Sequence, residues 1–230
     1  MPWSMAGGRV DPRTLEKLIQ QIEAKDLSTA AHTWRVVLYL RAMLEERGVK
    51  GEDLVIATHG AALHDIGKLD IPDAILQKPD RLTKAEFEVI EQHTVTGYAR
   101  MISLDVEDDR ILDLVRYHHE KMDGTGYPFH LKGDEIPRIA RDFAVVDTFD
   151  ALTSHRPYRH DVGTYAAERA LGILIEGKGD KYDNDSVELF ETLYRSSVLD
   201  FILDYFNDGA ELPAYGTIDD EELTRSIRVE

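Results

Sequence analysis

Residues 55–68 read VIATHGAALHDIGK and join an apolar helical pattern to a polar end. Apolar side chains recur there at spacings of three and four, the period of one face of an α-helix. The pattern predicts a helix over 52–66 that carries His64 and Asp65 in its last turn. A carboxylate that follows a buried face is costly unless it is paired, so this stretch indicates a helical fold and a polar site together.

The same period runs through the rest of the chain. No stretch alternates with period two, so we expect an all-α fold. Thr83 followed by Glu86 is the pattern of a capping box, and Pro137 suits a first helical position. Gly48 and Gly177 indicate helix ends. The further helices are expected over 13–25, 29–47, 84–101, 107–120, 137–153, 163–176 and 185–207.

The bulk composition is that of one globular domain. The chain has 230 residues, of which 43% are hydrophobic and 31% are charged, and both fractions are ordinary for a soluble protein. No apolar run approaches the ~18 residues that a membrane span needs. The N-terminus also lacks the apolar stretch of a secretory signal. We therefore expect a cytoplasmic protein without a membrane partner.

Charge and cysteine content restrict the ligands. The formal net charge is −17, which argues against duplex nucleic acid, because phosphate contacts need clustered Lys and Arg. Cysteine is absent, so a metal would bind His, Asp and Glu rather than thiolates. An anionic substrate is compatible with the charge, since two bound divalent cations would reverse the potential inside a small cleft.

Six ionisable residues on separate helical segments carry the chemistry. Taken alone, each has an ordinary explanation as a core or surface residue. Taken together, several ionisable groups on buried helix faces need a shared compensator, and a metal cluster supplies one. Imidazole and carboxylate ligands suit Fe, Mn, Zn, Co or Ni. The six are Asp147, the pair His64-Asp65, His93, and the pair His118-His119.

Two metals bridged by one carboxylate would use all of these groups. Paired metals can bridge a hydroxide, orient a phosphate and stabilise both the attacking and the leaving oxygen. Lys68 follows Asp65 by three residues, so its ammonium could reach a phosphoryl oxygen as charge develops in the transition state. The alternative for Lys68 is a solvated loop lysine. The constellation predicts a metal-dependent phosphohydrolase.

Three long motifs resemble the HD-GYP domain, a subgroup of the HD phosphohydrolase superfamily. They are AALHDIGKLDIPDAILQKPDRLT from residue 61, HHEKMDGTGYPFHLKGDEIP from residue 118 and FAVVDTFDALTSHRPYR from residue 143. The match runs from about His32 to about Asp185. The resemblance implies an HD-domain helical bundle that hydrolyses cyclic di-GMP, a bacterial second messenger, to linear pGpG, to GMP or to both.

The resemblance also implies residue roles. Lys68 would contact the scissile phosphate, and Asp65 would bridge two metals whose shared hydroxide attacks phosphorus. Arg156 and Arg159 fall where the family places basic ligand-binding residues, although a surface pair is the alternative. The implied metal ligands are His32, His64, Asp65 and Asp147 on one side, and His93, His118 and His119 on the other.

The segment 121–136 has the densest turn chemistry of the chain. Gly124 and Gly126 are expected to permit backbone turns that other residues cannot adopt. Tyr127 and Pro128 would then form a stiff, exposed knob that binds substrate or, in some family members, a signalling partner. The alternative is a purely structural turn that aims the two histidines before it.

One position departs from part of the family. Members with three metals place a Glu four residues before the position of His32, where this chain has Ser28. Serine is a poor metal ligand and a good helix N-cap. We therefore expect two divalent ions per chain, with iron or manganese first and zinc, nickel, cobalt or magnesium as alternatives.

The expected organisation is an N-terminal helical extension over 1–27, the catalytic domain over 28–208 and an acidic tail over 209–230. The N-terminal helix is amphipathic through Leu15, Leu18 and Ile22, and would pack on its own core or on another subunit. Two other functions stay open. One is an HD phosphohydrolase for another nucleotide, and the other is a signalling adaptor that binds partners through 121–136.

Overall fold

The computed structural model describes residues 10–26, 30–154, 164–206, 212 and 215. Within these residues the chain forms helices and no strand, and Lys178 and Tyr182 form an isolated bridge. The all-α expectation is thereby confirmed. The elements are α1 (Pro12–Asp26), α2 (Ala30–Glu46), α3 (Glu52–Leu63), η1 (Ile66–Asp70), α4 (Asp73–Leu76), α5 (Lys84–Glu91), α6 (His93–Ser103), α7 (Asp109–Tyr117), η2 (Gly133–Glu135), α8 (Arg138–Thr153), α9 (Thr164–Glu176), α10 (Asn184–Arg195) and α11 (Asp200–Tyr205).

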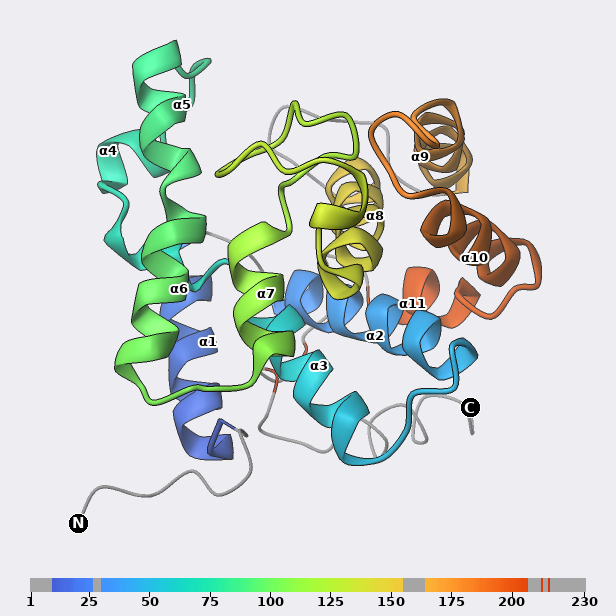
Figure 1. Ribbon diagram of the computed structural model, residues 1–230, viewed down its shortest axis with the longest axis horizontal. Coiled ribbons are helices and arrows are strands. Elements are labelled where there is room, and N and C mark those ends of the chain that lie inside the picture. The colour runs from blue at the N-terminus through green and yellow to red at the C-terminus, as the bar shows by residue number, and fades with distance from the viewer. Residues whose placement is uncertain (1–9, 27–29, 155–163, 207–211, 213–214, 216–230) are drawn as a thin grey trace.

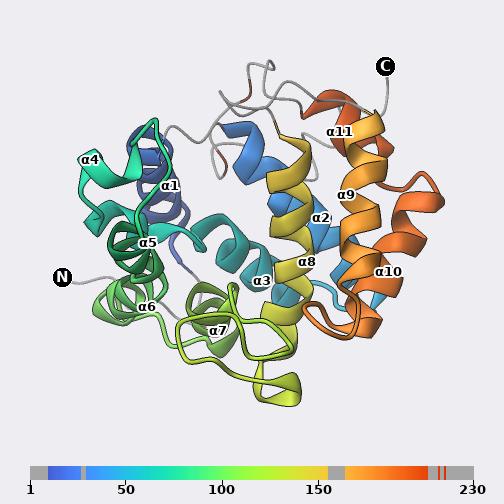
Figure 2. The same cartoon turned by 90° about the horizontal axis from the view of Figure 1, so that it is seen from above.

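Helix α2 forms the centre of the bundle. It packs against α3, α8, α10 and α11, and Figures 1 and 2 show it between a group of α1, α6 and α7 and a group of α9, α10 and α11. Its sequence explains this place, because residues 36–40 read VVLYL, an unbroken apolar run that covers every side of the helix, and such a stretch belongs in a core. The fully buried side chains of α2 are Trp34, Val36, Val37, Tyr39, Leu40 and Met43.

Helix α1 packs on its own chain. Leu15, Leu18 and Ile22 are buried, and the helix lies against α3 and η1. The first of the two alternatives for the N-terminal helix is therefore correct. The tail from 209 lies outside the described residues except for Leu212 and Tyr215, and the ring of Tyr215 is buried 4.9 Å from that of Trp34.

The segment 67–83, which contains Pro72 and Pro79, includes helical structure. It contains most of η1 and all of α4 before the capping box of Thr83 and Glu86 starts α5, as expected. None of the side chains of α5, all of which the structure describes, is buried. Figure 1 shows α4 and α5 standing out from one corner of the bundle.

Two predicted helices are interrupted. The helix expected over 84–101 breaks at Gln92, whose N–H bonds to the carbonyl of Val89 three residues back, so His93 starts α6 rather than lying in mid-helix. The helix expected over 185–207 breaks at Ser197, which has φ 62. A left-handed residue there ends α10 as glycine often does, without the glycine that would have revealed it.

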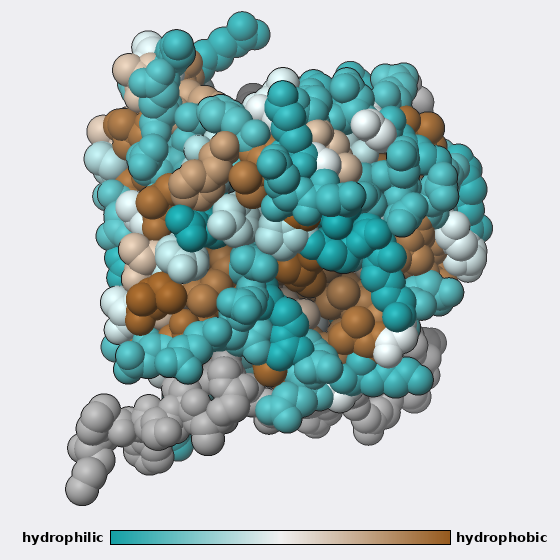
Figure 3. Space-filling model, viewed as in Figure 1, coloured by the Kyte–Doolittle hydropathy of each residue, from teal (hydrophilic) through white to brown (hydrophobic). Residues whose placement is uncertain are grey.

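The face of the molecule seen in Figure 3 is mainly polar, and its apolar side chains form separate patches. Phe87 and Phe129, which are 46% and 45% exposed, are among the large apolar side chains that reach solvent. Among the described helices, none combines the length and the apolar character needed to cross a bilayer.

The contact between η1 and α6 depends on glycine. A Cβ added to Gly67 would lie 1.9 Å from the carbonyl oxygen of His93 and 2.6 Å from the backbone nitrogen of Gly97. Backbone cannot yield as a flexible side chain does, so the two elements would have to separate.

We predict that Gly67→Ala lowers the free energy of unfolding by about 1–3 kcal/mol or more, because it overpacks a backbone contact. Gly172→Ala is the control. Its Cβ would meet nothing within 4 Å in the interior of α9, and alanine should stabilise that helix by about 0.5–1 kcal/mol. Urea unfolding of both variants measures the difference, and equal effects would contradict the proposed contact.

Candidate metal centre

The structure brings the seven predicted ligands to one place. His32 comes from α2 and Asp147 from α8, whereas the other five lie at helix ends. His64 and Asp65 follow α3, His93 starts α6, and His118 and His119 follow α7. Ligand atoms of Asp65, His93, His118 and His119 all lie within 4.8 Å of one another, and those of His32, His64 and Asp147 do the same.

Hydrogen-bond acceptors at Nδ1 fix the orientation of the imidazole rings. In four of them Nδ1 faces a protein acceptor, which places a ring proton on Nδ1 and leaves Nε2 as the candidate metal-binding nitrogen. Three of the four rings face backbone carbonyls one helical turn earlier, and the fourth faces a carboxylate. The pairs are His64 with Ala61 O at 2.8 Å, His93 with Ile90 O at 2.7 Å, His118 with Leu114 O and Val115 O at 3.1 Å each, and His32 with Asp150 Oδ2 at 2.8 Å.

The Nε2 atoms meet in the interior. Nε2 of His93 and Nε2 of His118 lie 3.2 Å apart, so with both protons on Nδ1 two lone pairs face each other. The rings form a continuous row, in which the centroids of His32 and His64 are 5.5 Å apart and those of His118 and His119 are 4.1 Å apart. Converging lone pairs of neutral imidazoles fit a divalent cation of the iron, manganese or zinc type.

Asp65 lies between the two groups of ligands. Its Oδ2 is 3.1 Å from Nε2 of His64 and its Oδ1 is 3.4 Å from Nε2 of His93. Nζ of Lys68 is 2.8 Å from Oδ2, so the lysine lies beside the cluster rather than out in solvent. Asp147 reaches the same region from α8, with Oδ1 4.0 Å from Nε2 of His64.

The carboxylates of Asp65 and Asp147 favour a positive charge beside them. Burial disfavours protonation of His64, but Asp65 and then Asp147 outweigh it and raise the pKa of His64 to about 9. Burial and the neighbouring imidazoles lower the pKa values of His118 and His119 well below normal. Those two rings are therefore neutral at neutral pH, which is the form that binds a metal.

The loop after α7 packs on the cluster. The Tyr127 ring lies 4.7 Å from that of His119 and 6.2 Å from that of Phe87 on α5. Tyr127 and Pro128 are only partly exposed, so the expected exposed knob is wrong, and Phe129 is the large side chain that reaches solvent there. Tyr127 instead forms part of the wall beside the histidines.

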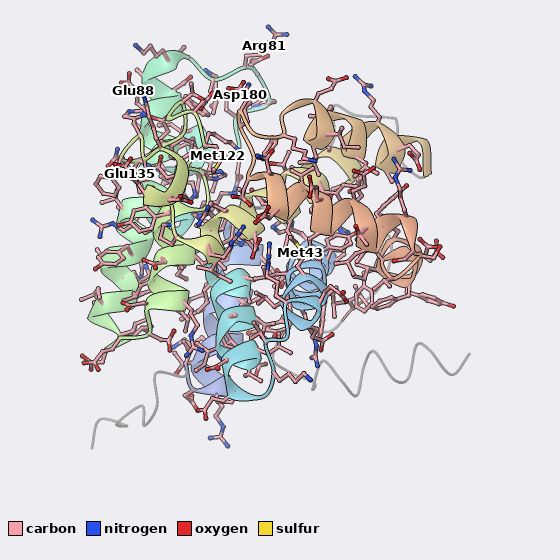
Figure 4. All side chains as sticks on the ribbon, turned by 45° about the vertical axis from the view of Figure 1, so that its right-hand side comes forward. Met43, Arg81, Glu88, Met122, Glu135 and Asp180 are labelled. Atoms are coloured by element: carbon pink, nitrogen blue, oxygen red, sulfur yellow. The ribbon has the colours of Figure 1, made fainter. Side chains whose placement is uncertain are left out.

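Glycine is needed at positions 124 and 126 of this loop for different reasons. Gly124 has φ 80, as the turn chemistry predicted. Gly126 does not have a positive φ, and what it supplies is space, because a Cβ there would lie 2.4 Å from the carbonyl oxygen of His119. Figure 4 shows Met122 of this loop near Asp180, where the N–H of Met122 bonds to the carbonyl of Lys181.

Glu120 holds the same loop and was not singled out from the sequence. Its buried carboxylate accepts the N–H of Phe129 at 2.7 Å and that of Leu131 at 3.0 Å. Burial raises its pKa, although these donors oppose the shift. Its place directly after His119 was the only available signal, and the alternative of a structural turn that aims the histidines gains support from these bonds.

Some predicted residues lie outside the described part of the chain. Arg156, Arg159 and Ser28 are among them, so their roles stay predictions. Besides Glu120 and Arg35, the described residues near the cluster that the sequence did not indicate include Asp150, behind His32; Lys121, whose Nζ lies 4.6 Å over the Tyr182 ring; and Phe87. None of them carries a sequence pattern that distinguishes it from an ordinary helix or loop residue.

Comparisons with known proteins identify the family. The family model of the HD domain matches residues 13–186. A cyclic di-GMP phosphodiesterase of Thermotoga maritima is 40% identical over 180 residues, which cover 76% of this chain and 47% of that protein. A 3'3'-cGAMP-specific phosphodiesterase of Vibrio cholerae is 36% identical over 156 residues, which cover 67% and 33%.

A solved structure has the same fold. The cyclic GMP-AMP specific phosphodiesterase of Vibrio cholerae aligns with a TM-score of 0.61 and 15% identity over 93% of this chain and 53% of that one. This chain spans less than half the length of the curated relatives that it matches. The chain belongs to the HD domain family, and the predicted resemblance to the HD-GYP subgroup is confirmed.

Replacement of Glu120 by Gln tests how the loop is held. One oxygen becomes an NH₂ group that faces a backbone N–H, and a buried donor left without an acceptor costs about 1–3 kcal/mol. Glu135→Gln is the control, since this exposed carboxylate also accepts a backbone N–H, that of Lys132 at 2.9 Å. We expect urea unfolding to show the loss in the first variant only, and equal midpoints would refute this account of the loop.

Proposed function

We propose that this chain is a metal-dependent phosphodiesterase that hydrolyses cyclic di-GMP to linear pGpG, to GMP or to both. The observation that carries the proposal is the convergence of imidazole Nε2 atoms on Asp65, whose two oxygens face different groups of ligands. The names of relatives such as the Thermotoga maritima enzyme support the substrate. A cytoplasmic location stays a prediction.

The proposed ligand sets are those of the sequence interpretation. His32, His64 and Asp147 would hold one ion, His93, His118 and His119 would hold the other, and Asp65 would serve both. Bound divalent ions supply Lewis-acid activation of water and of the phosphoryl group. In the overall reaction water adds to phosphorus and a ribose oxygen leaves, which opens the cyclic dinucleotide.

Side chains of this chain would stabilise the transition state and bind the substrate. Lys68, held 2.8 Å from Asp65, places a fixed positive charge where the phosphoryl oxygens gain negative charge, and preorganised charge of this kind stabilises the transition state. Tyr127 forms the wall beside His119 and would contact the substrate. Arg156 and Arg159 are proposed to bind its phosphate or guanine, because a guanidinium suits bidentate contacts to both.

A different cyclic dinucleotide is the second candidate. The relative from Vibrio cholerae that matches 67% of this chain is named a 3'3'-cGAMP-specific phosphodiesterase. The two substrates differ in one purine, so discrimination would lie in the residues that read the bases and not in the metal ligands. Competition between the two dinucleotides in one reaction, followed by chromatography, measures the preference.

A signalling adaptor is the third candidate. Its surface would be the loop after α7, where Phe129 is 45% exposed and stacks with Arg116, whose guanidinium carbon lies 4.6 Å from the ring centroid. An adaptor does not need seven ligands in place. Absence of turnover by the metal-loaded protein, together with tight binding of a partner, would favour this role.

The double substitution His64→Ala with Asp65→Ala tests the activity. We expect manganese- or iron-loaded variant to lose at least on the order of 10³-fold in hydrolysis, equivalent to about 4 kcal/mol of transition-state stabilisation. Circular dichroism should stay helical. His59→Ala, a buried histidine of α3 outside both ligand groups, should keep activity. Full activity of the double variant would overturn the site assignment.

Metal analysis tests the number of ions. Anaerobically purified protein should hold two ions per chain, and three would refute the prediction made from Ser28. Asp65→Asn should weaken both sites, because this side chain faces both groups. His119→Ala should weaken one site and leave the other. Titration of metal-free protein with Mn²⁺ against a competing chelator separates these outcomes.

A further inference from the structure

Helix α8 contains two buried aspartates with closely similar partners. Asp142 and Asp150 are both fully buried. Asp142 accepts two bonds from Arg47, at 2.8 and 3.0 Å, and one from Ser186 at 2.6 Å. Asp150 accepts two bonds from Arg35, at 2.5 and 3.3 Å, and one from Ser154 at 2.9 Å.

One contact distinguishes the two. Oδ2 of Asp150 also lies 2.8 Å from Nδ1 of His32, whereas the described partners of Asp142 include no ligand of the candidate metal centre. An ion pair that only stabilised α8 would not need an imidazole. The extra contact therefore requires its own explanation.

The helical spacing makes that contact specific. Asp147 and Asp150 are three residues apart on α8 and so lie on the same face. The ligand atom of Asp147 is within 4.8 Å of that of His32, while Asp150 holds Nδ1 of the same ring from behind. One turn of α8 thus carries both a candidate metal ligand close to His32 and the carboxylate that contacts Nδ1 of its ring.

Arg35 completes the arrangement from α2. It lies three residues after His32 and donates to Asp150, to Ser154 Oγ at 2.7 Å and to the carbonyl of Phe206 at 2.7 Å. A guanidinium that contacts both oxygens keeps the carboxylate ionised and acceptor-only. His32 must then donate through Nδ1, which makes Nε2 the nitrogen that would bind a metal.

We propose that Asp150 is a positioning residue that makes His32 a metal ligand, with Arg35 fixing the Asp150 carboxylate through both of its oxygens. The inference rests on the proposed metal centre. It singles out His32 because His64, His93 and His118 are held by backbone carbonyls, which no side-chain substitution removes. A carboxylate behind a metal-binding imidazole typically contributes a factor of about 10–100 in metal affinity.

The substitution Asp150→Asn should reverse the His32 tautomer. The shortest bond of Arg35 is to Oδ1, so the amide oxygen should take that position and the NH₂ group should face His32. The ring would then accept at Nδ1 and carry its proton on Nε2, the nitrogen needed for the metal. Asp142→Asn is the matched control, because it removes a carboxylate with the same burial and the same kinds of partner.

Three measurements on the full chain test the inference. Metal-free Asp142→Asn and Asp150→Asn should both lose stability in urea. Only Asp150→Asn should lower the affinity of one Mn²⁺ site, by about 10–100-fold. In ¹⁵N-detected spectra of metal-free protein, His32 should carry its proton on Nδ1 in the parent and on Nε2 in Asp150→Asn.

The outcomes distinguish the existence of the metal centre from the positioning role of Asp150. If the parent protein binds no divalent metal, the proposed centre fails. If the parent binds metal and both variants bind it equally, the positioning role alone is overturned. If Asp150→Asn does not fold, the parent spectrum still decides, because a His32 proton on Nε2 in the metal-free parent contradicts the inference.

Discussion

Five imidazoles and two carboxylates share one buried place in this bundle, and the rest of the fold is arranged around that concentration of lone pairs. Ionisable groups leave water at a high cost unless partners compensate them. Here the compensation starts with the backbone, since carbonyls one turn earlier hold His64, His93 and His118. Because those acceptors belong to helix ends, the position of each helix end fixes the direction of one Nε2.

Close backbone contacts supply the required precision. Gly67 lets η1 approach the start of α6 at His93, and Gly126 lets the loop return onto the carbonyl of His119. Both glycines lie against the backbone of a cluster histidine, and in both places the absence of a Cβ permits the contact. The site therefore depends on two places where side chains are absent as much as on those that are present.

The fold could be predicted from the sequence to a large extent. Helical periodicity located α1, α2, α3, α7, α8 and α9 within a few residues, and the capping box of Thr83 and Glu86 marked the start of α5. The breaks at Gln92 and Ser197 were missed, because neither residue is a glycine or proline. They follow from tertiary packing, which local patterns do not record.

The site was predictable where residue type alone defines the chemistry. Histidines and aspartates on apolar segments indicated the ligands, and the structure brings all seven together. Asp150, Arg35 and Glu120 escaped notice because their importance lies in their partners. Asp150 meets His32 across 118 positions of sequence, and an acidic residue in a helix carries no mark of such a partner.

The bond from Arg35 to the carbonyl of Phe206 has a consequence for biosynthesis. It spans 171 positions, so the earliest of the seven candidate ligands to leave the ribosome gains support, through Arg35, from the end of the last described helix. Chains generally fold from the N-terminus during synthesis, and distant pairings close late. His32 is therefore the first translated of the seven candidate ligands, and the set of bonds that holds Arg35 behind it is complete only once α11 has emerged.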